Sequence, residues 1–228
     1  MKKKYLEMIL DSIKPHPNPK SSLEQYTTEG KLASELLLYA QKDILNNVVF
    51  DLGCGTGRLS IGTKLLGAKK VFGFDIDSES ILCGIKNLKI LYNNPILDKL
   101  DINKDDLVNN IHFITKDIKD INFNYIESLM KEYNLENYKR VVIQNPPFGS
   151  QKRNADRIFL KKSLEIGDVI YTIHNSKTRD FVIKYIEDNG GQITHIFKGI
   201  FRIPMIYHFH KKKNKFIDID IYRIVKVK

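Results

Sequence analysis

Long apolar runs are missing from this chain of 228 residues. It has no stretch of about 18 consecutive apolar residues, which a membrane-spanning helix would need. The basic start "MKKK" is not followed by a hydrophobic segment, so the sequence does not predict a secretory signal peptide. We therefore expect a cytoplasmic protein with no membrane partner.

Cysteine is also scarce. The two cysteines, Cys54 and Cys83, do not form a CxxC motif and have no histidine at ligand spacing. The sequence therefore predicts neither a disulfide framework nor a metal site. With 42% apolar residues, the chain can bury one sizeable core. We expect a single domain over residues 1–228, with an N-terminal extension of helix and loop over about residues 1–45.

Acidic residues are fewer than basic ones. The chain has 27 Asp and Glu against 37 Lys and Arg, which gives a net charge of +10. Such a balance favours a polyanionic partner but does not identify one, because many soluble proteins are basic.

Strand-like and helix-like segments alternate after residue 45. Strands are predicted near 47–51, 70–75, 111–115, 139–144 and 168–174, and helices near 57–66, 78–92, 154–166 and 177–189. An earlier helix is predicted in "TTEGKLASELLLYAQKDIL", capped by Thr27 or Thr28. The insert 93–110 is interpreted as a loop that could contain one helical turn.

The end of the chain breaks this alternation. "GQITHIFKGIFRI" and "KFIDIDIYRIVKVK" are strand-like and leave no room for a helix between them, which indicates an antiparallel edge pair. The predicted fold is α/β: a doubly wound, mostly parallel seven-stranded sheet with an antiparallel C-terminal strand.

A glycine-rich segment, "DLGCGTGR", joins the first of these strands to its helix. Gly53, Gly55 and Gly57 would let the backbone approach a ligand closely. Arg58 stands where a dinucleotide fingerprint needs its third glycine, so that motif is not met. Ordinary tight turns are the alternative interpretation.

Carboxylates accompany this loop at the predicted strand ends. Asp51 precedes the glycines, Asp75 ends the next strand, and Asp117 follows the third. In such sheets ligands bind at the carboxyl ends of strands. Asp75 is placed to accept hydrogen bonds from two ribose hydroxyls, and Asp117 to lie beside an adenine ring.

The stretch "VVIQNPPFGS" ends the fourth predicted strand abruptly. An amide carbonyl from Asn145 and the backbone carbonyl of Pro146 could each accept one hydrogen of an exocyclic amine. Pro146 and Pro147 restrict the turn in advance, and Phe148 could stack on a base. The alternative is a simple strand terminator, since proline cannot continue a central strand.

Together, D-x-G-x-G-x-G and N-P-P-F resemble the S-adenosylmethionine-dependent methyltransferases that act on exocyclic amino groups. The segments "SLEQYTT", "FLKKSLE", "YTIHNSKTRDFV" and "HFHKKK" are similar to blocks of the archaeal and eukaryotic family of small-subunit ribosomal RNA N6-adenine methyltransferases. The chain differs from the eukaryotic pattern in the insert 93–110 and in Thr27, where proline is usual.

The resemblance implies roles for individual residues. S-adenosyl-L-methionine would be the cofactor, and Asn145, Pro146, Pro147 and Phe148 would receive the target base. The implied cofactor-binding residues include the three carboxylates and the three glycines described above. The full set is Gln25, Thr28, Asp51, Gly53, Gly55, Thr56, Gly57, Leu59, Asp75, Asp117 and Ile118.

The resemblance also implies partners: ribosomal RNA or the small ribosomal subunit, and a small zinc-binding activator subunit. Basic residues in "QKR" and "HKKKNK" are candidate RNA contacts; these are Lys152, Arg153, Lys211, Lys212 and Lys213. A solvated lysine-rich surface is the alternative. Alternative substrates remain open: guanine N2, an adenine of transfer RNA or DNA, or a protein glutamine. The chain could also be a non-catalytic RNA-binding assembly factor.

Overall fold

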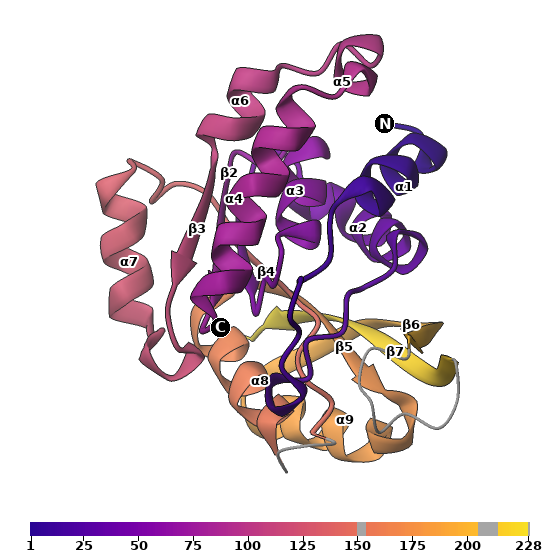
Figure 1. Ribbon diagram of the computed structural model, residues 1–228. Helices are drawn as coiled ribbons and strands as arrows, with labels where there is room; N and C mark the ends of the chain where they lie inside the picture. Colours follow the sequence, from indigo (N-terminus) through magenta and orange to yellow (C-terminus); the bar gives the residue numbers. More distant parts are fainter. Residues whose placement is uncertain (150–153, 205–213, 228) are drawn as a thin grey trace.

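A computed structural model describes residues 1–149, 154–204 and 214–227 (Figure 1). Seven strands form one sheet in the order β3-β2-β1-β4-β5-β7-β6. The first five strands are parallel, and β7 is antiparallel to both β5 and β6. This confirms the predicted α/β fold. The strands are β1 Val48–Leu52, β2 Lys70–Asp75, β3 Ile111–Thr115, β4 Arg140–Gln144, β5 Val169–Asn175, β6 Gly191–Pro204 and β7 Asn214–Lys226.

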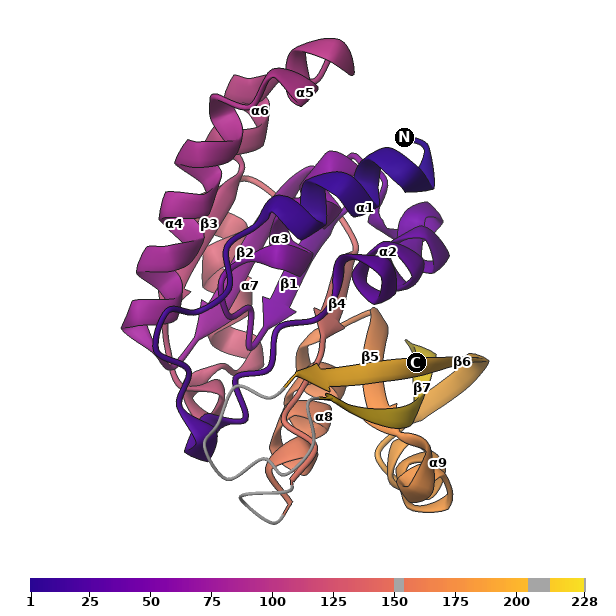
Figure 2. The ribbon, with the colours of Figure 1, turned by 45° about the vertical axis from the view of Figure 1, so that its right-hand side comes forward.

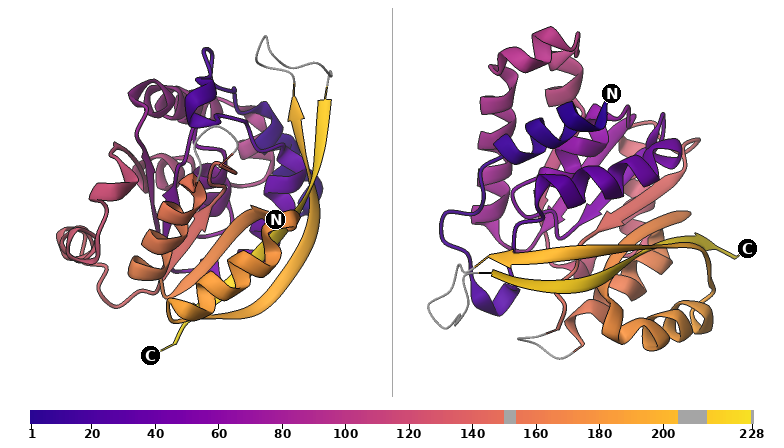
Figure 3. Two further views of the ribbon diagram at one scale, coloured as in Figure 1. Left: turned by 90° about the horizontal axis from the view of Figure 1, so that it is seen from below. Right: turned by 90° about the vertical axis from the view of Figure 1, so that its right-hand side faces the viewer.

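Helices cover both faces of this sheet because β1 to β5 have apolar side chains on both sides. In β1, Val49 packs with one layer of helices and Phe50 with the other. The first layer holds α1 Lys3–Ser12, α2 Gly30–Ile44, α3 Arg58–Leu65 and α4 Ser78–Tyr92, and the second holds α7 Phe123–Glu132, α8 Ala155–Ile166 and α9 Arg179–Asp188 (Figures 1 and 2). The long β6–β7 hairpin forms one edge of the sheet (Figure 3).

The N-terminal segment differs from the sequence prediction at the start of α2. The predicted threonine cap is wrong: the N-cap residue is Glu29, which makes no side-chain cap. The first amide of the helix, on Gly30, donates instead to Asp11 Oδ1 at 2.9 Å. Residues 13–29, which join α1 to α2, contain only one short 3-10 turn, Ser21–Leu23. We call residues 13–29 the strap.

Two helical regions were not expected. The insert 93–110 is not a loop but contains α5 Pro95–Lys99 and α6 Lys104–Asn109, capped by Asn94 and Asn103. One leucine of each helix is buried in the core, and this burial holds the insert in place. Helix α7 was missed, although Asn122 caps it in the usual way. In the described residues, no helix is long and apolar enough to cross a membrane.

Candidate cofactor and substrate site

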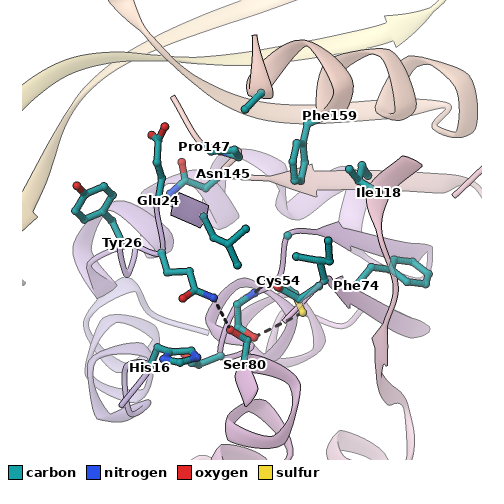
Figure 4. Close-up of a pocket in the computed structure, with 18 of the residues that line it drawn as sticks. His16, Glu24, Tyr26, Cys54, Phe74, Ser80, Ile118, Asn145, Pro147 and Phe159 are labelled. Atoms are coloured by element: carbon teal, nitrogen blue, oxygen red, sulfur yellow. Dashed lines mark hydrogen bonds between the residues drawn. The ribbon is translucent and has the colours of Figure 1, made fainter. Parts of the chain in front are cut away.

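A pocket of about 250 Å³ opens at the carboxyl ends of β1, β2 and β4, where the strand order reverses (Figure 4). This switch point is where open α/β sheets bind ligands. Segments far apart in the sequence meet here: the strap, the glycine loop, the turn after β4 and helix α8. The predicted site residues that line the pocket are Gln25, Thr28, Gly53, Gly55, Thr56, Leu59, Asp75, Asp117, Ile118, Asn145 and Pro147.

The glycine loop needs its glycines for two different reasons. Gly53, Gly55 and Gly57 all have φ between 54° and 86°, a region that other residues rarely adopt. Gly55 faces open space in the pocket wall. Gly57 does not line the pocket but forms the N-cap of α3, and a side chain there would collide with the ring of Phe113.

Asp75 is held rigidly at the pocket wall. Its Oδ2 accepts a hydrogen bond from the amide of Gly55 at 2.8 Å, and its Oδ1 accepts one from the amide of Asp77 at 2.9 Å. Burial raises the pKa of this carboxyl, and the two amide bonds oppose the shift. Each carboxylate oxygen can accept a second bond, so the group fits a vicinal diol such as that of a ribose.

Asp51 lies beneath the loop and does not line the pocket. Its Oδ2 accepts a hydrogen bond from the Ser60 hydroxyl at 2.6 Å, and Oδ1 is buried with no hydrogen-bond partner among the described residues. Burial raises the pKa of Asp51 to about 7. The Ser60 hydrogen bond ties Asp51 to α3. Its predicted part in cofactor binding stays a prediction.

The turn after β4 presents an amide with one end anchored and the other unpaired. Asn145 Nδ2 donates to Thr28 Oγ1 at 2.9 Å. Asn145 Oδ1 is buried and has no hydrogen-bond partner in the described part of the chain. Pro147 lies beside it, across the pocket from His16 and Ser80 (Figure 4). An unpaired buried acceptor is costly and calls for an explanation.

Phe148 is placed differently from the expectation. Its ring packs edge-on against Phe201, with centroids 5.5 Å apart, and it does not line the pocket. Its backbone amide donates to Glu24 Oε2 at 3.0 Å. The aromatic rings that do line the pocket belong to Tyr26, Phe74 and Phe159 (Figure 4). Stacking by Phe148 on a target base stays a prediction.

Asp77, which no sequence motif indicates, fixes the strap at the other side of the pocket. Its carboxylate is bound by Lys20 Nζ at 2.8 Å, Gln25 Nε2 at 2.7 Å and His16 Nε2 at 2.9 Å. Burial alone would raise the pKa of Asp77, but the bonds from Lys20 and Gln25 outweigh it and lower the pKa. Gln25 therefore anchors the strap as well as lining the pocket.

Arg58 is a second residue whose role was missed. Its guanidinium is buried and donates to the backbone carbonyls of Thr28 at 2.7 Å and of Ile13 at 2.9 Å. It thus ties both ends of the strap to the first turn of α3. No local pattern signals this, because the partners lie 30 and 45 residues away in the sequence.

The remaining predicted residues divide into two groups. Asp117 and Ile118 lie at the pocket, where Asp117 Oδ1 accepts a hydrogen bond from the amide of Lys119 at 2.9 Å. The candidate RNA contacts Lys152, Arg153, Lys211, Lys212 and Lys213 lie outside the described residues. Within the described ranges, no group of three or more His, Cys, Asp or Glu residues could hold a metal ion.

A doubly wound sheet whose pocket is lined by a glycine loop, a carboxylate that suits a vicinal diol and an Asn-Pro-Pro turn has the architecture of a class I methyltransferase. The family model of ribosomal protein L11 methyltransferase (PrmA) matches residues 26–123. Over 98% of both chains, the sequence is 32% identical to the rRNA N(6)-adenosine-methyltransferase METTL5 of Danio rerio. The chain therefore belongs to the METTL5-like methyltransferase family, and S-adenosyl-L-methionine is its cofactor.

Two archaeal proteins are similar over the whole chain. An uncharacterized protein of Methanocaldococcus jannaschii, MJ0284, is 55% identical over 100% of this chain and 95% of its own length. The crystal structure of PH1948 from Pyrococcus horikoshii, described as a candidate RNA methyltransferase, matches with a TM-score of 0.80 and 38% identity. That match covers 100% of this chain and 99% of the other.

Proposed function

We propose that this enzyme methylates N6 of an adenosine in the RNA of the small ribosomal subunit. The observation that carries the proposal is Oδ1 of Asn145 beside the cofactor pocket, which has no hydrogen-bond partner among residues 1–149, 154–204 and 214–227. A buried acceptor without a partner is suited to a ligand that brings a hydrogen-bond donor. The METTL5 relative acts, by its name, on rRNA N6-adenosine, which supports the same substrate class here.

An adenine amino group is a weak nucleophile because its lone pair is delocalised into the ring. Oδ1 of Asn145 and the carbonyl of Pro146 can each accept one hydrogen of this amine. Two such bonds favour a pyramidal nitrogen and direct its lone pair into the pocket. S-adenosylmethionine supplies the electrophilic methyl group. No strong base is needed, because the methylated, positively charged amine loses its proton readily to water.

The match to the ribosomal protein L11 methyltransferase family does not favour a protein substrate. It ends at residue 123, before β4 and the turn at Asn145. The match therefore covers the glycine loop and Asp75 on the cofactor side of the pocket. It does not include the turn at Asn145, where we place the substrate. We propose RNA on the strength of the full-length relative, and protein L11 becomes a competing substrate in the assay.

The test is a transfer assay with radiolabelled S-adenosylmethionine. The purified chain is incubated separately with small subunits, large subunits, transfer RNA, duplex DNA, protein L11 and a release factor. We expect label only in small-subunit RNA, recovered as N6-methyladenosine after digestion. Label confined to protein, or to another nucleoside, would overturn the proposal.

A matched variant tests the catalytic assignment. Asn145→Ala removes the amide, and we expect it to bind the cofactor normally while methyl transfer falls by roughly 100-fold or more, as for loss of one transition-state hydrogen-bonding group. Undiminished transfer would refute the role of Asn145.

A small zinc-binding activator subunit is part of the proposal. Full activity and stability of the isolated chain would refute that part.

A further inference from the structure

A chain of hydrogen bonds connects the cofactor loop to the substrate side of the pocket. Arg58, in the first turn after the glycine loop, donates to the backbone carbonyl of Thr28 at 2.7 Å. The hydroxyl of Thr28 accepts from Asn145 Nδ2 at 2.9 Å. Thr28 is buried, and it lies 117 residues from Asn145 in the sequence. Such a contact exists only if the strap crosses the catalytic turn.

The contact decides which end of the amide meets the substrate. An amide presents a carbonyl acceptor at one end and two N–H donors at the other. With Nδ2 bound by Thr28, Oδ1 is the end left without a partner among the described residues. If the amide turned over, it would present donors to an amine that itself needs acceptors. A fixed orientation therefore matters more at Asn145 than at an ordinary surface amide.

The surroundings of Thr28 limit its movement. Its carbonyl is held by Arg58, and four residues earlier in the strap Glu24 Oε2 accepts from the amide of Phe148 at 3.0 Å. The strap thus contacts both ends of the catalytic turn, residues 145–148: Thr28 binds Asn145, and Glu24 binds Phe148. A rigid partner costs the amide less ordering in the bound state than a mobile one would.

We propose that Thr28 is a positioning residue of the methyl transfer, which holds the amide of Asn145 with Oδ1 toward the target amine. The inference rests on the proposed function of Asn145. The family resemblance implies that Thr28 contacts the cofactor. The positioning role proposed here is a different one. The two roles differ in what they change: loss of positioning lowers kcat, whereas loss of a cofactor contact raises KM for S-adenosylmethionine.

The decisive variant is Thr28→Val, which removes the hydroxyl and keeps the branched shape. We expect kcat to fall roughly tenfold, equivalent to about 1.4 kcal/mol of barrier. The dissociation constant for S-adenosylmethionine, measured by calorimetry, should stay within about twofold of the wild-type value. This is well below the roughly tenfold change expected in kcat. Thr28→Ser, which retains the hydroxyl, should restore most of kcat. Thr194→Val, at an exposed position of β6, is the matched control and should leave kcat unchanged.

A double-mutant cycle separates positioning from general structural damage. If Thr28 acts through Asn145, adding Thr28→Val to Asn145→Ala should cause no further loss of kcat. An additive loss, a defect confined to cofactor affinity, or no rescue by serine would each overturn the inference. If Thr28→Val does not fold, Thr28→Ala replaces it in the cycle. Failure of Asn145→Ala to lower kcat would instead refute the proposed function.

Discussion

Replacement of Asp77 by asparagine should weaken the strap and lower the stability of the protein. The Asp77 carboxylate is 3% exposed and binds Lys20, Gln25 and His16 at 2.7 to 2.9 Å. An asparagine has the same shape but no charge, and its amide nitrogen would face a hydrogen-bond donor. The variant therefore loses both the charge and part of the hydrogen bonding.

The size of the effect follows from the burial of each partner. Hydrogen bonds to a charged group contribute about 1.5–3 kcal/mol each. The Lys20 side chain is 51% exposed, so solvent screening leaves it only a minor contribution. Asparagine can still accept one bond, for instance from Gln25. We expect a loss of about 2 kcal/mol in the free energy of unfolding, or about 4–8 °C in Tm for a chain of this size.

The assay is thermal unfolding of Asp77→Asn and of the matched control Glu79→Gln. Glu79 lies two residues away and its side chain is 42% exposed, so its replacement should change Tm little. Because the folded state lowers the pKa of Asp77, its stabilisation is present above about pH 4 and is lost as the pH falls below that value. The difference between wild type and Asp77→Asn should therefore shrink in acid. Equal Tm values at pH 7 would refute the reasoning.

Two further predictions concern the glycine loop and the carboxyl beneath it. Gly57→Ala should lower the free energy of unfolding by roughly 2–4 kcal/mol, because positive φ and a collision with Phe113 add together. Gly190 has a similar φ, but a Cβ added there would meet no atom of the described residues within 4 Å, so calorimetric unfolding of Gly190→Ala should show only roughly 1 kcal/mol lost. A larger loss at Gly190 would contradict this account. Burial raises the pKa of Asp51 to about 7, so its protonated form favours folding in acid and this stabilisation is lost as the pH rises through 7. Asp51→Asn should accordingly raise Tm more at pH 8 than at pH 5, and an equal change at both pH values would show that Asp51 stays ionised in the fold.

The strands and the glycine loop could be predicted because their signals are local. β1 begins with the apolar run Val48, Val49 and Phe50, and the first glycine follows directly after the strand. Helices α5 and α6 were missed because each is only one or two turns long and depends on a single buried leucine. Such short helices are stabilised by packing, which has no signature in a short window.

The sequence by itself determined the sheet with its switch point, the glycine loop with Asp75, and the turn at Asn145. Adjacent residues specify each of these, and parallel strands bring their carboxyl ends to one edge. Only the tertiary structure decided that the strap crosses this edge, that Arg58 and Asp77 hold it, and that Thr28 binds Asn145 Nδ2. Such contacts join residues 30 to 117 positions apart, and their geometry depends on how the whole core packs.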